Sequence, residues 1–149
     1  ALDAGQLAWL DRQLSARPAT PTLVFLHHPP FETGIAHMDV QRLLNAPDLV
    51  EVLARHAQLR LVSCGHVHRA ISTTLAGVPC MIAPAPAHAV TLDTRPEAEP
   101  TFTLEPGAVT VHRWRGGGLD GALTSSISYL GRFDGPHPFF ADEGSLIVS

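Results

Sequence analysis

Thr22–Pro30 (TLVFLHHPP) and Leu59–His68 (LRLVSCGHVH) are the two stretches that decide the fold of this chain. Each begins as a short run of β-prone apolar residues and ends in histidines, beside Pro in the first stretch and Gly in the second. The sequence between them has a helical pattern long enough for a crossover. Open α/β sheets place their chemistry at the carboxyl ends of their parallel strands. The two stretches therefore predict a right-handed βαβ unit with histidines gathered at one edge of a sheet.

The composition bounds the class of protein. With 149 residues, 45% of them hydrophobic, the chain has the size of one domain with a substantial core. A net charge of −4 gives no reason to expect nucleic acid or an anionic membrane as a partner. No apolar run approaches the roughly 20 residues that cross a bilayer, and two cysteines are too few for a disulfide scaffold. We expect a cytoplasmic protein and, because the chain begins with Ala1, a fragment or a processed product.

The first part of the chain predicts a helix, a buried strand, a helical crossover and a second strand. Asp3 is placed to cap a helix that carries a stripe of leucines. Residues 22–27 are predicted as a fully buried strand, because the apolar run is continuous rather than alternating. Residues 39–54 have a helical pattern in two pieces, and Asp48 is placed to cap the second piece. The next strand is predicted at residues 59–64.

The second part of the chain is rich in short β-like runs. Three strands are predicted, at residues 70–75, 78–83 and 89–92. Residues 101–104 and 109–114 flank Glu105-Pro106-Gly107, a turn sequence typical of a C-terminal β-hairpin.

The aromatic residues near the end of the chain suggest a division into two parts. Residues 1–115 are predicted to form the folded domain. Residues 116–149, which begin with three glycines and carry several aromatic side chains, are predicted to be an irregular tail that packs on the domain or on a partner.

His27, His66 and His68 are the candidate metal ligands. His66 and His68 lie two residues apart, so both side chains point to one face if the segment is extended, and Gly65 allows close approach. Neutral imidazole binds zinc, iron, manganese and similar divalent ions. Three histidines without a thiolate suit a catalytic site with open positions. The simpler interpretation is a pair of polar turns, but histidines at the ends of both strands of one βαβ unit favour a metal site.

Several segments of this chain resemble one family. The motifs His27-His28-Pro29-Pro30 and Gly65-His66-Val67-His68 are similar to the last two metal-binding motifs of the calcineurin-like metallophosphoesterases. Within that superfamily, the cyclic-nucleotide and glycerophosphodiester phosphodiesterase branch is the most similar, through Phe31–Ile35 with Met38-Asp39, Cys64–Arg69, Ala83–Asp93 and Gly135–Phe139.

The resemblance implies a fold and a chemistry. The fold would be an α/β protein of the α+β sandwich type, of which this chain forms the C-terminal half, with one βαβ unit and a C-terminal β-hairpin. The site would be a dinuclear centre of divalent ions (Mn, Fe, Zn or similar), with His27 and His66 on one metal, His68 on the other, and His66 at the catalytic centre. A metal-bound hydroxide would then hydrolyse a small-molecule phosphodiester, a cyclic nucleotide or a glycerophosphodiester.

One departure from the family limits what this chain can do alone. The family's earlier motifs, which supply a bridging carboxylate, an asparagine ligand and a further histidine, occur nowhere in the sequence. Two dications held close together by neutral ligands repel strongly. We therefore expect at most one ion in this chain alone, no activity without more protein, and a partner that is either a missing N-terminal half or a second copy in a homo-oligomer.

Other histidines have weaker assignments. His28, His37 and His88 are candidates for substrate binding, whereas His56 and His112 are expected on the surface of a helix and a strand. Two other functions stay open. The chain could be a non-catalytic assembly module whose hairpin and aromatic tail form an interface. It could also be a mononuclear metal-binding domain that uses the three candidate ligands.

Overall fold

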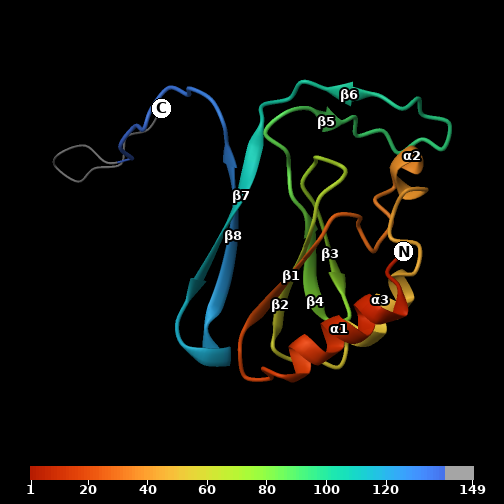
Figure 1. The fold of residues 1–149 in the computed structure, drawn as a ribbon. Helices are drawn as coiled ribbons and strands as arrows, with labels where there is room; N and C mark the ends of the chain where they lie inside the picture. The colour runs from red at the N-terminus through yellow and green to blue at the C-terminus, as the bar shows by residue number, and fades with distance from the viewer. Residues whose placement is uncertain (140–149) are drawn as a thin grey trace.

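A computed structural model describes residues 1–139 of the chain (Figure 1). The helices are α1 (Ala4–Ser15), α2 (Ala36–Asp39), α3 (Ala46–Leu53) and the 3₁₀ helix η1 (Gly118–Asp120). The strands are β1 (Thr22–Leu26), β2 (Leu59–Cys64), β3 (Ile71–Leu75), β4 (Val78–Ile82), β5 (Ala89–Val90), β6 (Phe102–Thr103), β7 (Ala108–Arg115) and β8 (Ala122–Tyr129).

The predicted βαβ unit is confirmed, and its two strands form one side of a four-stranded sheet with the order β1-β2-β4-β3. Strands β1 and β2 are parallel, with Leu26 opposite Cys64, and β2 is also parallel to β4. Strand β3 returns antiparallel to β4 through the turn at Ala76 and Gly77, both of which have positive φ. The carboxyl ends of β1, β2 and β4 therefore meet at one edge of the sheet.

The hydrophobic core lies between this sheet and helices α1 and α3, on the side of the sheet that faces away from the β7–β8 hairpin (Figure 1). Alternate residues of β2 and β4 point into it, including Val62, Cys64 and Ile82. Helix α1 begins where predicted, because Asp3 and Gln6 form a reciprocal capping box. No described helix is long and apolar enough to cross a bilayer.

Strand β1 is less buried than predicted. A continuous apolar run predicts burial on both faces, yet no residue of β1 is fully buried and Phe25 is 66% exposed. Among the described residues, β1 pairs with β2 alone, so that its other edge is open. An edge strand has only one neighbour to cover it, and this accounts for the difference.

The predicted hairpin pairs the wrong strands. Residues 102–103 pair with β5, not with β7, and β7 pairs instead with β8 along their whole length. The turn of the real hairpin is made by the glycine-rich segment that contains η1, because Gly116 and Gly118 adopt positive φ there. Residues 122–129, predicted to be irregular, are thus a strand, and the hairpin does lie near the C-terminus.

The other differences are local. The first crossover helix, α2, starts at Ala36 rather than at residue 39, and helix α3 is preceded by Asn45 rather than capped by Asp48. The last ten residues of the predicted tail, 140–149, lie outside the described part of the chain. The division at residue 115 stays a prediction.

Candidate metal centre

The edge where β1 and β2 end holds the first two candidate ligands. The two strand ends are tied together by the amide of Gly65, which donates to the carbonyl of His27 over 3.0 Å. A Cβ at position 65 would lie 3.4 Å from Nδ1 of His27, at van der Waals contact. The β2 terminus therefore lies directly beside the His27 ring.

His27, His28 and His66 form one compact cluster. One nitrogen of each imidazole can be chosen so that all three lie within 4.8 Å of one another. The ring centroids are 4.8 Å apart for His27 and His28, 5.1 Å for His27 and His66, and 4.7 Å for His28 and His66. His27 and His28 are exposed, whereas His66 is half-buried. The structure thus brings together two of the predicted ligands and a residue that was predicted to contact substrate.

His68 lies in a different environment. The prediction that His66 and His68 share a face assumed an extended segment, but both residues have left-handed backbones, with φ of 75° and 58°. The imidazole of His68 packs edge to face against His88, with ring centroids 4.7 Å apart, and His88 in turn contacts Phe102 at 5.2 Å. The Gly-His-Val-His turn therefore places the His66 ring against His27 and His28, and the His68 ring against His88.

The protonation state of His66 suits a ligand. Burial lowers the pKa of His66, and the neighbouring imidazoles of His28, His27 and His68 lower that pKa further. A lowered pKa favours the neutral imidazole, which is the form that binds metals. Nε2 of His66 is also buried without a hydrogen-bond partner among the described residues, and Nδ1 of His68 is in the same condition. Buried polar atoms are rarely left unpaired, so the donor set fits a cation.

The remaining predicted residues are dispersed. His37 lies on α2 and is not part of the three-histidine cluster, and its buried Nδ1 has no hydrogen-bond partner within residues 1–139. His56 was predicted on the surface of a helix, but it follows the end of α3 and is buried, with its Nε2 2.8 Å from Oδ1 of Asp11 on α1. No carboxylate joins the histidine cluster within the residues that the structure describes.

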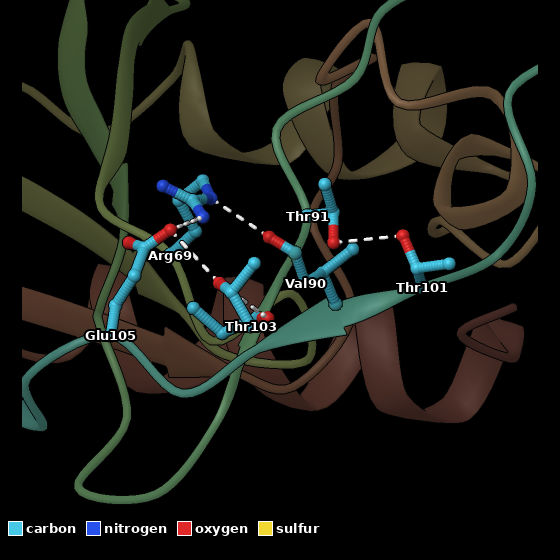
Figure 2. A network of polar contacts seen from close by, with 7 residues as sticks. Arg69, Val90, Thr91, Thr101, Thr103 and Glu105 are labelled. Atoms are coloured by element: carbon cyan, nitrogen blue, oxygen red, sulfur yellow. Dashed lines mark hydrogen bonds and ion pairs between the residues drawn. The ribbon is translucent and has the colours of Figure 1, made fainter.

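An arginine that the sequence analysis did not single out anchors the turn that carries His68 (Figure 2). The guanidinium of Arg69 donates to the carbonyl of Val90 over 2.8 Å and pairs with the carboxylate of Glu105. This pairing, with a second hydrogen bond from Thr103, lowers the pKa of Glu105. Arg69 thereby joins the turn after β2 to β5 and to the segment after β6. The sequence signal that could have identified Arg69 is its position directly after the His-x-His motif.

A groove adjoins the cluster on the hairpin side of the sheet. It has a volume of about 520 Å³ and is lined by residues of β1, β2 and β7, among them Phe25, Ser63 and Thr110. His27 and Gly65 also line it. A ligand in this groove would thus reach the edge of the cluster from the sheet face opposite the core.

The chain is similar in sequence to curated bacterial phosphodiesterases. It is 40% identical over 147 residues to a probable glycerophosphodiester phosphodiesterase of Arcobacter nitrofigilis, a match that covers 98% of this chain and 53% of the relative. It is 33% identical over 128 residues to the 3',5'-cyclic adenosine monophosphate phosphodiesterase of Escherichia coli, covering 84% of this chain and 43% of that protein. The chain thus spans about half the length of the curated relatives it matches.

Two further comparisons concern the fold. The structure of a dimetal phosphatase from Danio rerio superposes with a TM-score of 0.51 and 20% identity, over 73% of this chain and 32% of that one. At that identity the likeness supports the fold alone. No protein-family profile matches the chain.

Proposed function

Because this chain is a homologue of the glycerophosphodiester and cyclic-nucleotide phosphodiesterases of the calcineurin-like superfamily, we propose that it carries part of the site of a metal-dependent phosphodiesterase. The observation that carries the proposal is the convergence of His27 and His66 at the carboxyl edge of the sheet, where Nε2 of His66 has no hydrogen-bond partner among residues 1–139. The substrate would be a small phosphodiester of the cyclic-nucleotide or glycerophosphodiester type.

Each histidine has a part in this proposal. In a complete protein of the relatives' length, His27 and His66 would hold one divalent ion, with His66 at the catalytic centre, and His68 would hold a second ion that this chain alone does not bind. A bound ion supplies Lewis acidity toward phosphoryl oxygens and lowers the pKa of water. Imidazole suits zinc and iron, whereas manganese would also need the carboxylate ligands that further polypeptide supplies. His28, His37 and His88 are the candidates for contacts with the substrate.

The missing carboxylates limit this part of the site. Neutral imidazoles do not offset the repulsion between two neighbouring dications, and the described residues add no carboxylate to the cluster. We propose that this chain alone holds at most one ion and does not turn over, and that further polypeptide supplies the acidic ligands. That polypeptide would be the remainder of a protein as long as the relatives, or a second copy of the chain.

The test is hydrolysis of bis(p-nitrophenyl) phosphate with added manganese. The isolated chain should not exceed the manganese blank. A protein of the relatives' length that contains this sequence should turn over the substrate and lose activity in His27→Ala and His66→Ala. Robust turnover by the isolated chain that disappears in His66→Ala would contradict its proposed incompleteness.

A second candidate function is assembly, and the exposed apolar side chains of the β7–β8 hairpin favour it. Val111, Ile127 and Tyr129 are 51%, 43% and 60% exposed. An apolar two-stranded ribbon commonly gains cover by pairing with another chain. Size-exclusion chromatography distinguishes the two functions, since a monomer at all concentrations would count against assembly.

A further inference from the structure

We propose that His28, and not His68, is the third ligand of the ion held by this chain, and that His27, His28 and His66 form a mononuclear three-imidazole site. This inference rests on the proposed function in taking the histidine cluster to be a metal site. It goes beyond that function by changing the ligand set and therefore the class of metal that the chain selects.

The distances favour His28. Its ring lies 4.7 Å from that of His66, closer than the 5.1 Å between His27 and His66. Zinc binds imidazole nitrogen at about 2.0–2.1 Å, so ligand nitrogens in a tetrahedral site lie about 3.3 Å apart. The nitrogens of the cluster, within 4.8 Å of one another, would have to close by about 1.5 Å. Side-chain rotation of the two exposed histidines, His27 and His28, can supply this movement.

The backbone explains how two consecutive residues can face the same ion. Successive side chains alternate across a strand, but β1 ends at Leu26, so His27 and His28 are free of that alternation. The chain directly after them is fixed. Pro29 is fully buried, and its carbonyl accepts a hydrogen bond of 2.9 Å from the amide of Leu43. His27 and His28 therefore lie on a short bend that is held in place at its C-terminal end by Pro29.

His68 makes its ring contact outside the three-histidine cluster. Its carbonyl accepts a hydrogen bond from the amide of Ala85, and its ring packs edge to face against His88. The next residue, Arg69, is tied to Val90 and to Glu105. A rotation that turned the His68 ring into the cluster would have to break its contact with His88, whereas the His28 ring already belongs to the cluster.

The donor set determines the class of ion. Three neutral nitrogens without a carboxylate or a thiolate suit zinc and other borderline ions such as cobalt, nickel and copper. Manganese, magnesium and calcium favour oxygen ligands. The chain should therefore bind one equivalent of zinc or cobalt and bind manganese much more weakly. Exposure of His27 and His28 leaves the remaining coordination positions open to solvent.

The experiment is calorimetric titration of the full chain with zinc and with cobalt, in which His28→Ala is compared with the matched variant His68→Ala. We expect one equivalent bound by the native chain, a loss of affinity of about 100-fold or more in His28→Ala, and a change of less than about threefold in His68→Ala. His28→Gln repeats the test with a side chain of similar length, and circular dichroism verifies that each variant is folded.

Nitrogen-15 spectra of the imidazoles identify the ligands directly. Addition of zinc should shift the ring signals of His27, His28 and His66 and leave those of His68 and His88 in place. Binding that depends on His68 and not on His28, or no binding by the native chain, would overturn the inference. Because these readouts involve no hydrolysis, the two proposals fail separately: no turnover by the protein of the relatives' length, with zinc binding by this chain intact, would count against the proposed function and leave this ligand set standing.

Discussion

The two histidine groups at the carboxyl edge of the sheet share one turn but differ in construction. In the first group, three imidazoles face one another and Nε2 of His66 is buried without a partner in the described chain. In the second group, the His68 ring contacts His88 edge to face, His88 contacts Phe102 in the same way, and Arg69 anchors the turn. The first group gathers three ligand nitrogens, whereas the second offers the Nδ1 of His68, buried without a partner in the described chain, beside a single further histidine.

Two left-handed residues in the same turn account for the difference. An extended His-x-His segment would send both rings to one face, whereas positive φ at His66 and His68 directs them to different neighbours. Such backbone conformations cost free energy outside glycine and gather at functional sites. Between the two histidines, the side chain of Val67 is fully buried and fastens the turn to the core.

The largest expected effect comes from breaking that anchor. Val67→Asp would place a carboxylate in an apolar interior, and we expect it to lower the free energy of unfolding by about 3 kcal/mol or more. Both histidine groups should be lost together. The matched control is Val40→Asp, because Val40 is 72% exposed, and it should change stability by less than about 0.5 kcal/mol. Urea denaturation measures both, and equal costs would show that Val67 does not fasten the turn.

A smaller effect on stability is expected from substitutions at His68, which distinguish the cost of its backbone conformation from the loss of its ring contacts. His68→Gly and His68→Ala both remove the imidazole, but only glycine adopts positive φ without cost. We expect the glycine variant to be more stable by about 0.5–1 kcal/mol. The same pair of changes at His88, which is not a positive-φ residue, should show no advantage for glycine. Thermal unfolding of the four variants tests this, and a preference for alanine at position 68 would argue against the left-handed turn.

The smallest expected effect lies at a contact that belongs to neither group. The pKa of Asp11 is lowered below its ordinary value of 3.8, first by the hydrogen bond with His56 and then by the charge of Arg55. A lowered pKa contributes stability that is complete above pH 3.8 and is lost as the pH falls through the folded-state value. Asp11→Asn should therefore lower the melting temperature at neutral pH, with a difference from the native chain that shrinks below pH 3.8. A difference independent of pH would contradict this origin.

Much of the sheet could be predicted from the sequence because its signals are local. The apolar runs of β1 and β2, the turn at Gly77 and the capping pair of Asp3 and Gln6 each depend on neighbouring residues. The hairpin could not be predicted, because Pro106-Gly107 is as good a turn signal as the later glycines. The choice depends on long-range pairing, since Thr103 lies opposite Ala89.

Part of the site could also be predicted from local signals, and the rest could not. The positions of His27 and His66 follow from strand order and direction, which the βαβ pattern gives. The contribution of His28 depends on where β1 ends. The separate contacts of His68 depend on positive φ at His66 and His68, a conformation that is uncommon even for histidine. The buried position of His56 could not be predicted, because its polar partner is Asp11 of α1, a residue distant in sequence.

X-ray absorption at the zinc edge, recorded on the chain loaded with one equivalent of zinc, counts the imidazole ligands. Three imidazole rings should contribute to the scattering, with the remaining coordination completed by small oxygen ligands. In His28→Ala the signal should fall to two rings, whereas in His68→Ala it should stay at three. A native spectrum with fewer than three imidazoles, or one that loses a ring in His68→Ala and not in His28→Ala, would contradict the site described for this chain.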